Sequence, residues 1–502
     1  MSLFDAIRNR GMHPLVHSGA GQYRADEFLR KVRYRNRLLR QCDVRCLALL
    51  ADNGPEWLIT DLAARLAGVT LIPLPAFFTP RQLQNALDVT AADALITDSA
   101  PLPGFRPTVR LTETLSLSLR PASGVKIPAG VTKVTFTSGT TAEPKGICLR
   151  AAALDAVAAS IADATQAVSV QRHLCALPLA VLLENVAGVY GAFLRGAELA
   201  VPPLHELGWN GSSSFDAARL LECLDRFQPQ SMILLPQMLK ALVIELTRTG
   251  KRLSGLRFVA VGGARTPAAL VEAARALGLP AYEGYGLSEC GSVVSLNVPG
   301  NDCPGSVGVP LPGREVRISS SGHIEIRRPG YLGYLGSLSD APEWLDTGDI
   351  GHFDARGFLH ISGRSKNLLI TGFGRNISPE WVQSELLSEP GVLQAMVLGD
   401  AWPALGALLV TAPGTDAEAA VSRCNARLPD YARIGAWRRV DHMNNDNGLA
   451  TGNGRIRREH AARFHRARIE SMYEQVQGRH GVHRATVSPS NKQEPTCPST
   501  QS

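Results

Sequence analysis

A dense run of small hydroxyl residues and glycine is the first candidate for chemistry. The run consists of Thr137, Ser138, Gly139, Thr140 and Thr141. Lys145 follows it between a proline and a glycine. Consecutive hydroxyls and backbone N–H groups in a tight turn can surround a polyphosphate, with a lysine as a point charge. Because the Gly-Lys-Ser/Thr ending of a Walker A loop is missing, the run predicts another kind of phosphate loop, and a polar surface turn is the alternative.

The surrounding sequence predicts the elements that must hold this loop. The apolar stretches 130–136 and 147–150 indicate a strand on each side of it. Strands at 46–52, 69–75 and 92–98 alternate with helices at 54–68 and 79–90, and the alternation returns over 218–286. Such alternation is typical of parallel sheets covered by helices on both faces. Around 304–365 the pattern changes to short strands and turns, as in an antiparallel β-rich subdomain.

Four further motifs follow in order along the chain. They are VGGA at 261–264, YEGYGLSE at 282–289, WLDTGDIG at 344–351, and the segment 363–386 that begins GRSKN. With the hydroxyl run, these motifs resemble the adenylate-forming superfamily, which includes acyl-CoA synthetases, aryl-CoA ligases, peptide-synthetase adenylation domains and luciferases. The hydroxyl run departs from that pattern only at Ala142, where glycine is usual. The resemblance covers roughly residues 45–460.

The resemblance implies a fold class and a domain division. The expected fold is α/β, with a large N-terminal body of stacked mixed and parallel sheets, helices and the β-rich subdomain, followed by a small mobile α+β C-terminal domain. The body is expected to span 1–365 and the small domain 366–475, with a disordered tail at 480–502. Lys366 lies at the family's hinge position, and Gly372 and Gly374 lie in the loop that approaches the incoming thiol in relatives.

The resemblance also implies ATP and Mg²⁺ as ligands. The nucleotide would contact the hydroxyl run, Gly262, Gly263, Ala264, Glu283, Gly284, Tyr285, Gly286, Asp349 and Arg364. Tyr285 would stack on the adenine, opposite a wall formed by the backbone of residues 262–264. Glu283, where the family often has Asn or Gln, would accept from the adenine amino group. Asp349 would bind both ribose hydroxyls, and Arg364 would bind the ribose or a phosphate.

Four residues are expected to serve catalysis. Lys145 would neutralise the β- and γ-phosphates, Ser288 would donate to the α-phosphate, and Glu289 would hold Mg²⁺, which prefers oxygen ligands. In relatives a lysine of the C-terminal domain supplies a further cation, but the matching segment 447–459 has Arg455 there. Arginine keeps the charge, although it is broader than a lysine. Either Arg455 performs adenylation in modified form, or the protein is an impaired or non-catalytic homologue that binds nucleotide or acyl-adenylate.

The implied reaction has two halves. A substrate carboxylate attacks the α-phosphorus of ATP to give acyl-AMP and pyrophosphate, and a thiol then displaces AMP to give a thioester. The acyl pocket is expected near Val181, Leu182 and Glu184, although a helix-surface position for Glu184 is an open alternative. The apolar residues 181–183 favour a fatty or aromatic acid over an amino acid. The thiol is expected to come from coenzyme A or from the phosphopantetheine arm of a carrier protein.

Composition excludes several other classes of protein. Hydrophobic residues make up 45% and charged residues 19% of the 502 residues, an ordinary globular balance. Without an apolar run of about 18 residues or a secretory h-region, a cytoplasmic protein with no transmembrane segment is expected. The nine cysteines are scattered, as free thiols would be. The 44 arginines and 8 lysines are spread along the chain, so nucleic acid is not an expected partner, although the basic helix predicted at 455–468 leaves nucleic acid or an anionic membrane as a minor alternative.

Overall fold

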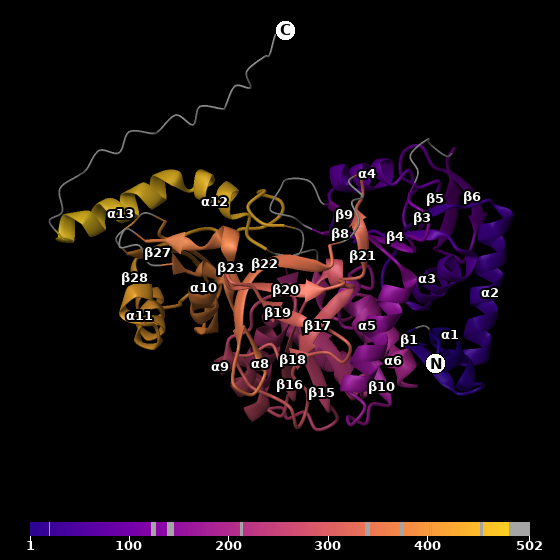
Figure 1. Ribbon diagram of the computed structural model, residues 1–502, viewed down its shortest axis with the longest axis horizontal. Coiled ribbons are helices and arrows are strands. Elements are labelled where there is room, and N and C mark those ends of the chain that lie inside the picture. Colours follow the sequence, from indigo (N-terminus) through magenta and orange to yellow (C-terminus); the bar gives the residue numbers. More distant parts are fainter. Residues whose placement is uncertain are drawn as a thin grey trace, which may run out of the picture.

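The computed structural model describes residues 1–19, 21–121, 127–137, 145–210, 214–336, 342–371, 376–400, 402, 404–451 and 455–480. A large α/β body comes first, and a smaller C-terminal domain lies beside it (Figure 1). The predicted fold class is confirmed. The tail beyond 480, like the loop residues 138–144, lies outside the described residues.

The first sheet of the body has eight strands. Their order is β21-β9-β8-β4-β3-β5-β7-β6. Their bounds are β3 Cys46–Leu50, β4 Thr70–Pro73, β5 Ala94–Thr97, β6 Arg106–Arg110, β7 Ser116–Leu119, β8 Lys133–Thr137, β9 Lys145–Leu149 and β21 Tyr331–Tyr334. Strands β5, β3, β4 and β8 are parallel, as predicted, and β8 pairs with β9 in antiparallel fashion. The hydroxyl run therefore connects two paired strands.

The second sheet has nine strands. Their order is β18-β17-β16-β15-β14-β10-β11-β1-β2. Their bounds are β1 Pro14–Ser18, β2 Gly21–Arg24, β10 Arg172–Leu174, β11 Glu198–Ala200, β14 Ser231–Leu234, β15 Phe258–Val261, β16 Ala281–Leu287, β17 Ser292–Leu296 and β18 Val309–Pro310. The strands from β16 to β1 are parallel to one another. The carboxyl ends of parallel strands are where α/β sheets bind ligands, and the VGGA and YEGYGLSE motifs lie at the ends of β15 and β16.

Helices pack on these sheets. Their bounds are α1 Leu3–Asn9, α2 Ala25–Gln41, α3 Pro55–Ala67, α4 Pro80–Val89, α5 Ala151–Ala164, the π-helix η1 Leu183–Tyr190, α6 Gly191–Leu194, α7 Ala217–Phe227, α8 Pro236–Thr249 and α9 Ala268–Ala276. Helix α4 begins as predicted. Thr79, directly before Pro80, is the N-cap residue and forms a reciprocal capping box with Gln82. The largest apolar core includes residues of both sheets and of α2, α3 and α5.

An antiparallel sheet and the C-terminal domain complete the structure. The sheet has the order β19-β20-β22-β23, with bounds Val316–Ile318, His323–Arg327, Trp344–Phe353 and Leu359–Arg364. The short elements η2 Ser288–Cys290, β12 Trp209–Asn210 and β13 Ser214–Phe215 precede it along the chain. The domain contains η3 Ser365–Asn367, β24 Leu369–Ile370, β25 Asn376–Ile377, α10 Pro379–Ser388, β26 Val392–Leu398, β27 Leu405–Thr411, α11 Ala417–Arg427, η4 Asp430–Ala432, β28 Ile434–Arg439, α12 Arg458–Phe464 and α13 Arg466–His480.

The structure corrects one expectation about the C-terminal domain and bears on two about the whole chain. The basic segment 455–468 is not one helix, since Ile456 bridges to Ala450 before α12 begins and a break separates α12 from α13. Within the described part of the chain, none of the helices has both the length and the apolar character needed to cross a bilayer. The eight cysteines that the structure describes are all free.

Candidate active site

A buried carboxylate organises one half of the site. Asp349 on β22 is opposite Arg364 on β23, and this antiparallel register brings their side chains together. Arg364 Nε donates to Asp349 Oδ1 at 2.7 Å, and the Tyr285 hydroxyl donates to Oδ2 at 2.7 Å. Asp349 is only 6% exposed. Burial and the Asp349 carboxylate raise the pKa of Tyr285, so its hydroxyl stays protonated and acts as a donor. Three predicted nucleotide residues thus form one hydrogen-bonded cluster.

Glu283 lies deeper on the same strand as Tyr285. Its Oε1 accepts a hydrogen bond from the Thr266 backbone N–H at 3.1 Å, and the residue is 5% exposed. Burial raises the pKa of Glu283 to about 8, although the Thr266 N–H and the charge of Arg265 oppose this shift. The side chain is therefore largely protonated at neutral pH, and a neutral carboxyl can both donate and accept hydrogen bonds.

Glycine is needed at two positions of this region for different reasons. Gly263 has φ +84°, in the left-handed region, and a Cβ there would lie 3.0 Å from Leu235 Cδ2. A Cβ on Gly286 would lie 1.7 Å from the Ser292 carbonyl oxygen, because β17 passes directly beside it. Gly284 is similarly crowded by β17, whereas Gly262 and the exposed Ala264 leave the end of β15 without bulk.

The other half of the site centres on Tyr334. Its hydroxyl donates to Glu289 Oε1 at 2.8 Å, and the Lys145 Nζ lies 5.6 Å from the centroid of its ring. Burial and then the Glu289 carboxylate raise the pKa of Tyr334, so the hydroxyl remains a donor. Strand β21 carries Tyr334 to this position by pairing with β9, where Tyr334 is opposite Ile147. Sequence analysis missed Tyr334, because nothing local indicates that its strand joins the first sheet.

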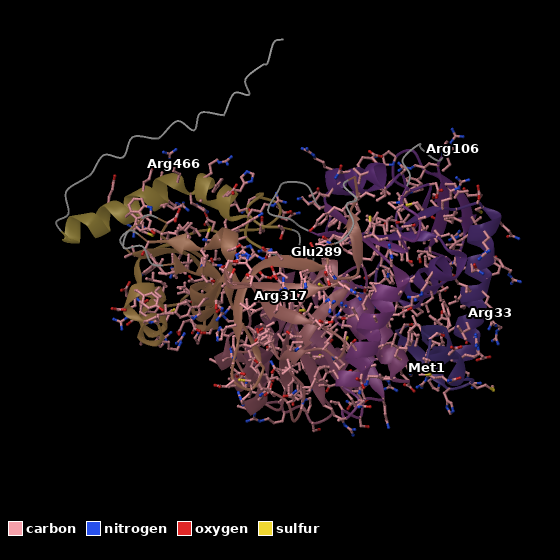
Figure 2. The ribbon with its side chains drawn as sticks, in the orientation of Figure 1. Met1, Arg33, Arg106, Glu289, Arg317 and Arg466 are labelled. Carbon is pink, nitrogen blue, oxygen red and sulfur yellow. The ribbon has the colours of Figure 1, made fainter. Side chains whose placement is uncertain are left out.

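The two halves belong to one electrostatic environment. Burial of Arg364 opposes its charge, but Asp349, Tyr285 and Glu289 outweigh that effect and raise the pKa of the guanidinium. Arg364 in turn opposes the rise in the pKa of Tyr334. Lys145 and Glu289 are therefore linked through Tyr334, and the charges of Glu289 and Asp349 both act on Arg364. Glu289 lies centrally in the molecule, whereas Arg33, Arg106 and Arg466 lie at its periphery (Figure 2).

Arg455 reaches this environment from the C-terminal domain. Its backbone N–H donates to Thr451 Oγ1 at 3.1 Å, and the Thr451 N–H donates to the Arg455 carbonyl at 2.7 Å. We call residues 449–451 and 455–457 the Arg455 segment. Desolvation and the like charge of Arg364 lower the pKa of the exposed Arg455, whereas Glu380 and Asp349 oppose the change. The charges of Arg364 and Asp349 thus both act on its guanidinium.

The predicted acyl-pocket residues have different surroundings. Val181 is half-buried before η1, and Leu182 is buried at its start. Glu184 is fully buried, with Oε1 at 3.0 Å from His173 Nε2 and Oε2 accepting from the Leu177 N–H at 2.9 Å. The helix-surface alternative for Glu184 is therefore wrong, because both of its oxygens bind inside the protein.

Leu183 lies next to the glycine pair at 262 and 263, and with Leu235 it forms what we call the apolar wall. The Leu183 Cδ2 would lie 3.9 Å from a Cβ on Gly262, and the Leu235 Cδ2 would lie 3.0 Å from a Cβ on Gly263. Both leucines are half-buried. The π-helical turn that begins at Leu183 is a geometry often found at functional sites. The apolar wall and the glycine pair therefore lie side by side.

The remaining predicted residues are less informative. Ser288 is half-buried and opens the short turn η2, next to Glu289. Lys366 is exposed in η3, between the two parts of the chain. The backbone of Thr137 ends β8 opposite Lys145. Ser138, Gly139, Thr140, Thr141, Gly372 and Gly374 lie outside the described residues.

Similarity to known proteins identifies the family. Residues 27–335 match the AMP-binding enzyme family, and residues 366–477 match the AMP-binding enzyme C-terminal domain. The chain belongs to the AMP-binding enzyme family. This assignment confirms the predicted superfamily and the predicted enzyme class, an AMP-forming acid–thiol ligase that resembles acyl-CoA synthetases.

Relatives of this AMP-binding enzyme are named as acid–CoA ligases. It is 29% identical to the 3-[(3aS,4S,7aS)-7a-methyl-1,5-dioxo-octahydro-1H-inden-4-yl]propanoyl:CoA ligase of Mycobacterium tuberculosis, over 79% of this chain and 85% of that protein. It is 27% identical to the 2-succinylbenzoate–CoA ligase of Bacillus velezensis, over 79% of this chain and 84% of the relative. The O-succinylbenzoate coenzyme A synthetase of Bacillus subtilis in complex with AMP has the same fold, with a TM-score of 0.74 and 23% identity over 91% of this chain and 97% of that one.

Proposed function

We propose that this enzyme activates an apolar carboxylic acid with ATP and Mg²⁺ and transfers the acyl group to coenzyme A. The observation that carries the proposal is the hydrogen-bonded Asp349–Arg364–Tyr285 cluster of the body, whose charged members Asp349 and Arg364 also act on the pKa of Arg455 in the C-terminal domain. Adenylation needs a positive charge near the substrate carboxylate and the α-phosphate. Arg455 would bring this charge from the C-terminal domain to the proposed ribose site around Asp349. The names of the relatives, which act on acids and CoA, support the same reaction.

In the first half-reaction, a carboxylate oxygen attacks the α-phosphorus and the pyrophosphate leaves with the electrons of the broken P–O bond. Catalysis then consists mainly of bringing anions together and neutralising them. Asp349 would accept the ribose hydroxyls, Lys145 would neutralise the outer phosphates, and Arg455 would stabilise negative charge between the carboxylate and the α-phosphate. Glu289 retains an oxygen beside the one that Tyr334 occupies, and this carboxylate would hold Mg²⁺. The metal would neutralise charge on the pyrophosphate.

In the second half-reaction, the thiol sulfur attacks the acyl carbon, AMP leaves with the electrons of the C–O bond, and the thiol proton is released to water. The acyl chain would lie along Leu183 and Leu235, next to the glycine pair. An apolar wall without a free carboxylate favours an acid that lacks an amino group, because an ammonium there would be desolvated without a partner. A fatty or aromatic acid is the proposed substrate class.

The proposal is tested by acid-dependent exchange of pyrophosphate into ATP with a panel of acids, and separately by thioester formation with CoA or a carrier protein as acceptor. Arg455→Ala should lower the exchange about a hundredfold, since the loss of one preorganised charge-stabilising donor typically costs that much. Arg455→Lys should keep part of the activity, because it keeps the charge. Arg463→Ala, an exposed arginine on α12, is the matched control and should exchange normally.

The non-catalytic alternative rests on the arginine at position 455. Calorimetry that detects ATP binding, together with no pyrophosphate release from any acid, would favour it. Full exchange by Arg455→Ala would instead remove Arg455 from the mechanism. Products found only as free acyl-AMP with either acceptor would exclude the thioester half of the proposal.

A further inference from the structure

A single lysine of the body binds the end of a helix in the C-terminal domain. Lys240 on α8 donates to the backbone carbonyl oxygens of Leu387, of Glu389 at 3.1 Å and of Val392 at 2.8 Å. These carbonyls lie at the last turn of α10 and in the connection to β26. An ammonium has three donors, so the three carbonyls satisfy it completely. The negative end of the α10 dipole adds to the attraction.

The acceptors of Lys240 are themselves held firmly. Glu389 is 3% exposed, and its carboxylate accepts from Arg423 Nε and from the Arg427 guanidinium, each at 2.7 Å. Both arginines are on α11, so the turn after α10 is tied to the rest of the C-terminal domain. Burial lowers the pKa of the Lys240 ammonium to about 8, while the charge of Glu389 opposes the shift. A desolvated ammonium is stable here only while the carbonyls remain in place.

The same helix is connected to the Arg455 segment. Arg458, which directly follows that segment, donates to Gln383 Oε1 of α10 and to the Val397 carbonyl of β26. Glu380, at the start of α10, is one of the charges that act on Arg455. Helix α10 is therefore joined to Lys240 of α8 at its end and, through Arg458, to the Arg455 segment. Figure 1 shows α8 and α10 on the two sides of the boundary between body and C-terminal domain.

We propose that Lys240 is a positioning residue that holds the C-terminal domain in the orientation required for adenylation. It acts through α10 on Arg455 and touches no substrate. The proposal rests on the proposed function, because it assigns this orientation to the first half-reaction. A domain that must turn to expose the acyl-adenylate to a thiol has to release the three carbonyls, so Lys240 should serve the first half-reaction and not the second.

The test compares the two half-reactions in the full chain. Lys240→Met keeps the length of the side chain but removes all three donors, and should lower ATP–pyrophosphate exchange about tenfold, the usual effect of losing a few net hydrogen bonds. Thioester formation from a synthetic acyl-adenylate and CoA should stay within about twofold of wild type, a change too small to reflect a lost contact. Lys240→Arg should restore much of the exchange. Lys251→Met is the control, because the wild-type Lys251 ammonium pairs with Asp225, which belongs to the same body and not to the C-terminal domain.

A second readout separates this proposal from the proposed function. Backbone hydrogen exchange at residues 386–392 should become faster in Lys240→Met and remain slow in Lys251→Met. If hydrogen exchange is faster in Lys240→Met but the wild-type protein activates no acid, Lys240 still holds the C-terminal domain. That result would refute only the proposed function. Equal losses in both half-reactions, or unchanged pyrophosphate exchange in Lys240→Met, would overturn the role of Lys240.

Discussion

The two sides of the site are built in different ways. In the body, Asp349, Arg364 and Tyr285 bind one another on adjoining strands, so their arrangement exists without help from the C-terminal domain. Arg455, in contrast, makes its hydrogen bonds to Thr451, within its own segment, among the residues that the structure describes. Its approach to the body depends on how a whole domain is docked. The comparison suggests that the body supplies nucleotide affinity, whereas the domain supplies a cation that can be withdrawn.

The largest expected effect comes from breaking the preassembled side. Asp349→Ala removes the acceptor of both Arg364 and Tyr285 and leaves a partly buried guanidinium without its partner. We expect kcat/KM for ATP to fall a hundredfold or more, because the two ribose hydroxyls would lose their charged acceptor and one hydrogen bond to a charged group contributes about 1.5–3 kcal/mol. ATP affinity, measured by calorimetry, should fall as well. Arg455→Ala with its ATP affinity reduced to the same extent would contradict the division between the two sides.

A smaller effect is expected at the phosphate side of the body. Tyr334→Phe keeps the ring beside Lys145 but removes the hydrogen bond to Glu289. We expect the Mg²⁺ concentration for half-maximal exchange to change several-fold, since one hydrogen bond to a charged group contributes about 1.5–3 kcal/mol. The variant should unfold at nearly the wild-type temperature. An unchanged Mg²⁺ dependence would show that Glu289 acts independently of Tyr334.

The smallest effect concerns the dependence of stability on pH. The folded pKa of Glu283, about 8, lies above its ordinary value, so the folded state binds more protons than the unfolded state between these values. The stabilisation is present below the ordinary pKa of 4.5 and is lost as pH rises through about 8. Glu283→Gln should therefore flatten the decline of the unfolding temperature between these pH values, as measured by calorimetry. Identical pH profiles for the variant and the wild type would rule out Glu283 as the source of the decline.

Local patterns were sufficient to predict much of the body. Alternating apolar segments predict β3, α3, β4, α4 and β5, and these elements form, with β3 parallel to β4 and β5 as predicted. A single hairpin register places Asp349 opposite Arg364, so two residues from separate motifs meet. Thr79 before Pro80 marks the start of α4, because capping depends on residues only three positions apart.

The rest depends on contacts between residues far apart in the chain. Tyr334 reaches Glu289 only because β21 leaves its sequence neighbours and pairs with β9. Lys240 is an unremarkable helix residue until α10 docks against it. Glu184 was ambiguous because a carboxylate on an apolar helix becomes a core residue only when distant partners, here His173 and the Leu177 N–H, satisfy it.

The π-helical geometry of η1 gives the apolar wall an unusual means of change. The turn contains one residue more than an α-helix would need, and Leu183 lies at its start. A one-residue deletion between 185 and 190 would relax the stretch to ordinary α geometry and rotate its beginning by about 100°. Leu183 and Glu184 could not then both keep their present neighbours. Loss of a single codon here would therefore reshape the apolar wall proposed for the acyl chain without the exchange of any side chain in it.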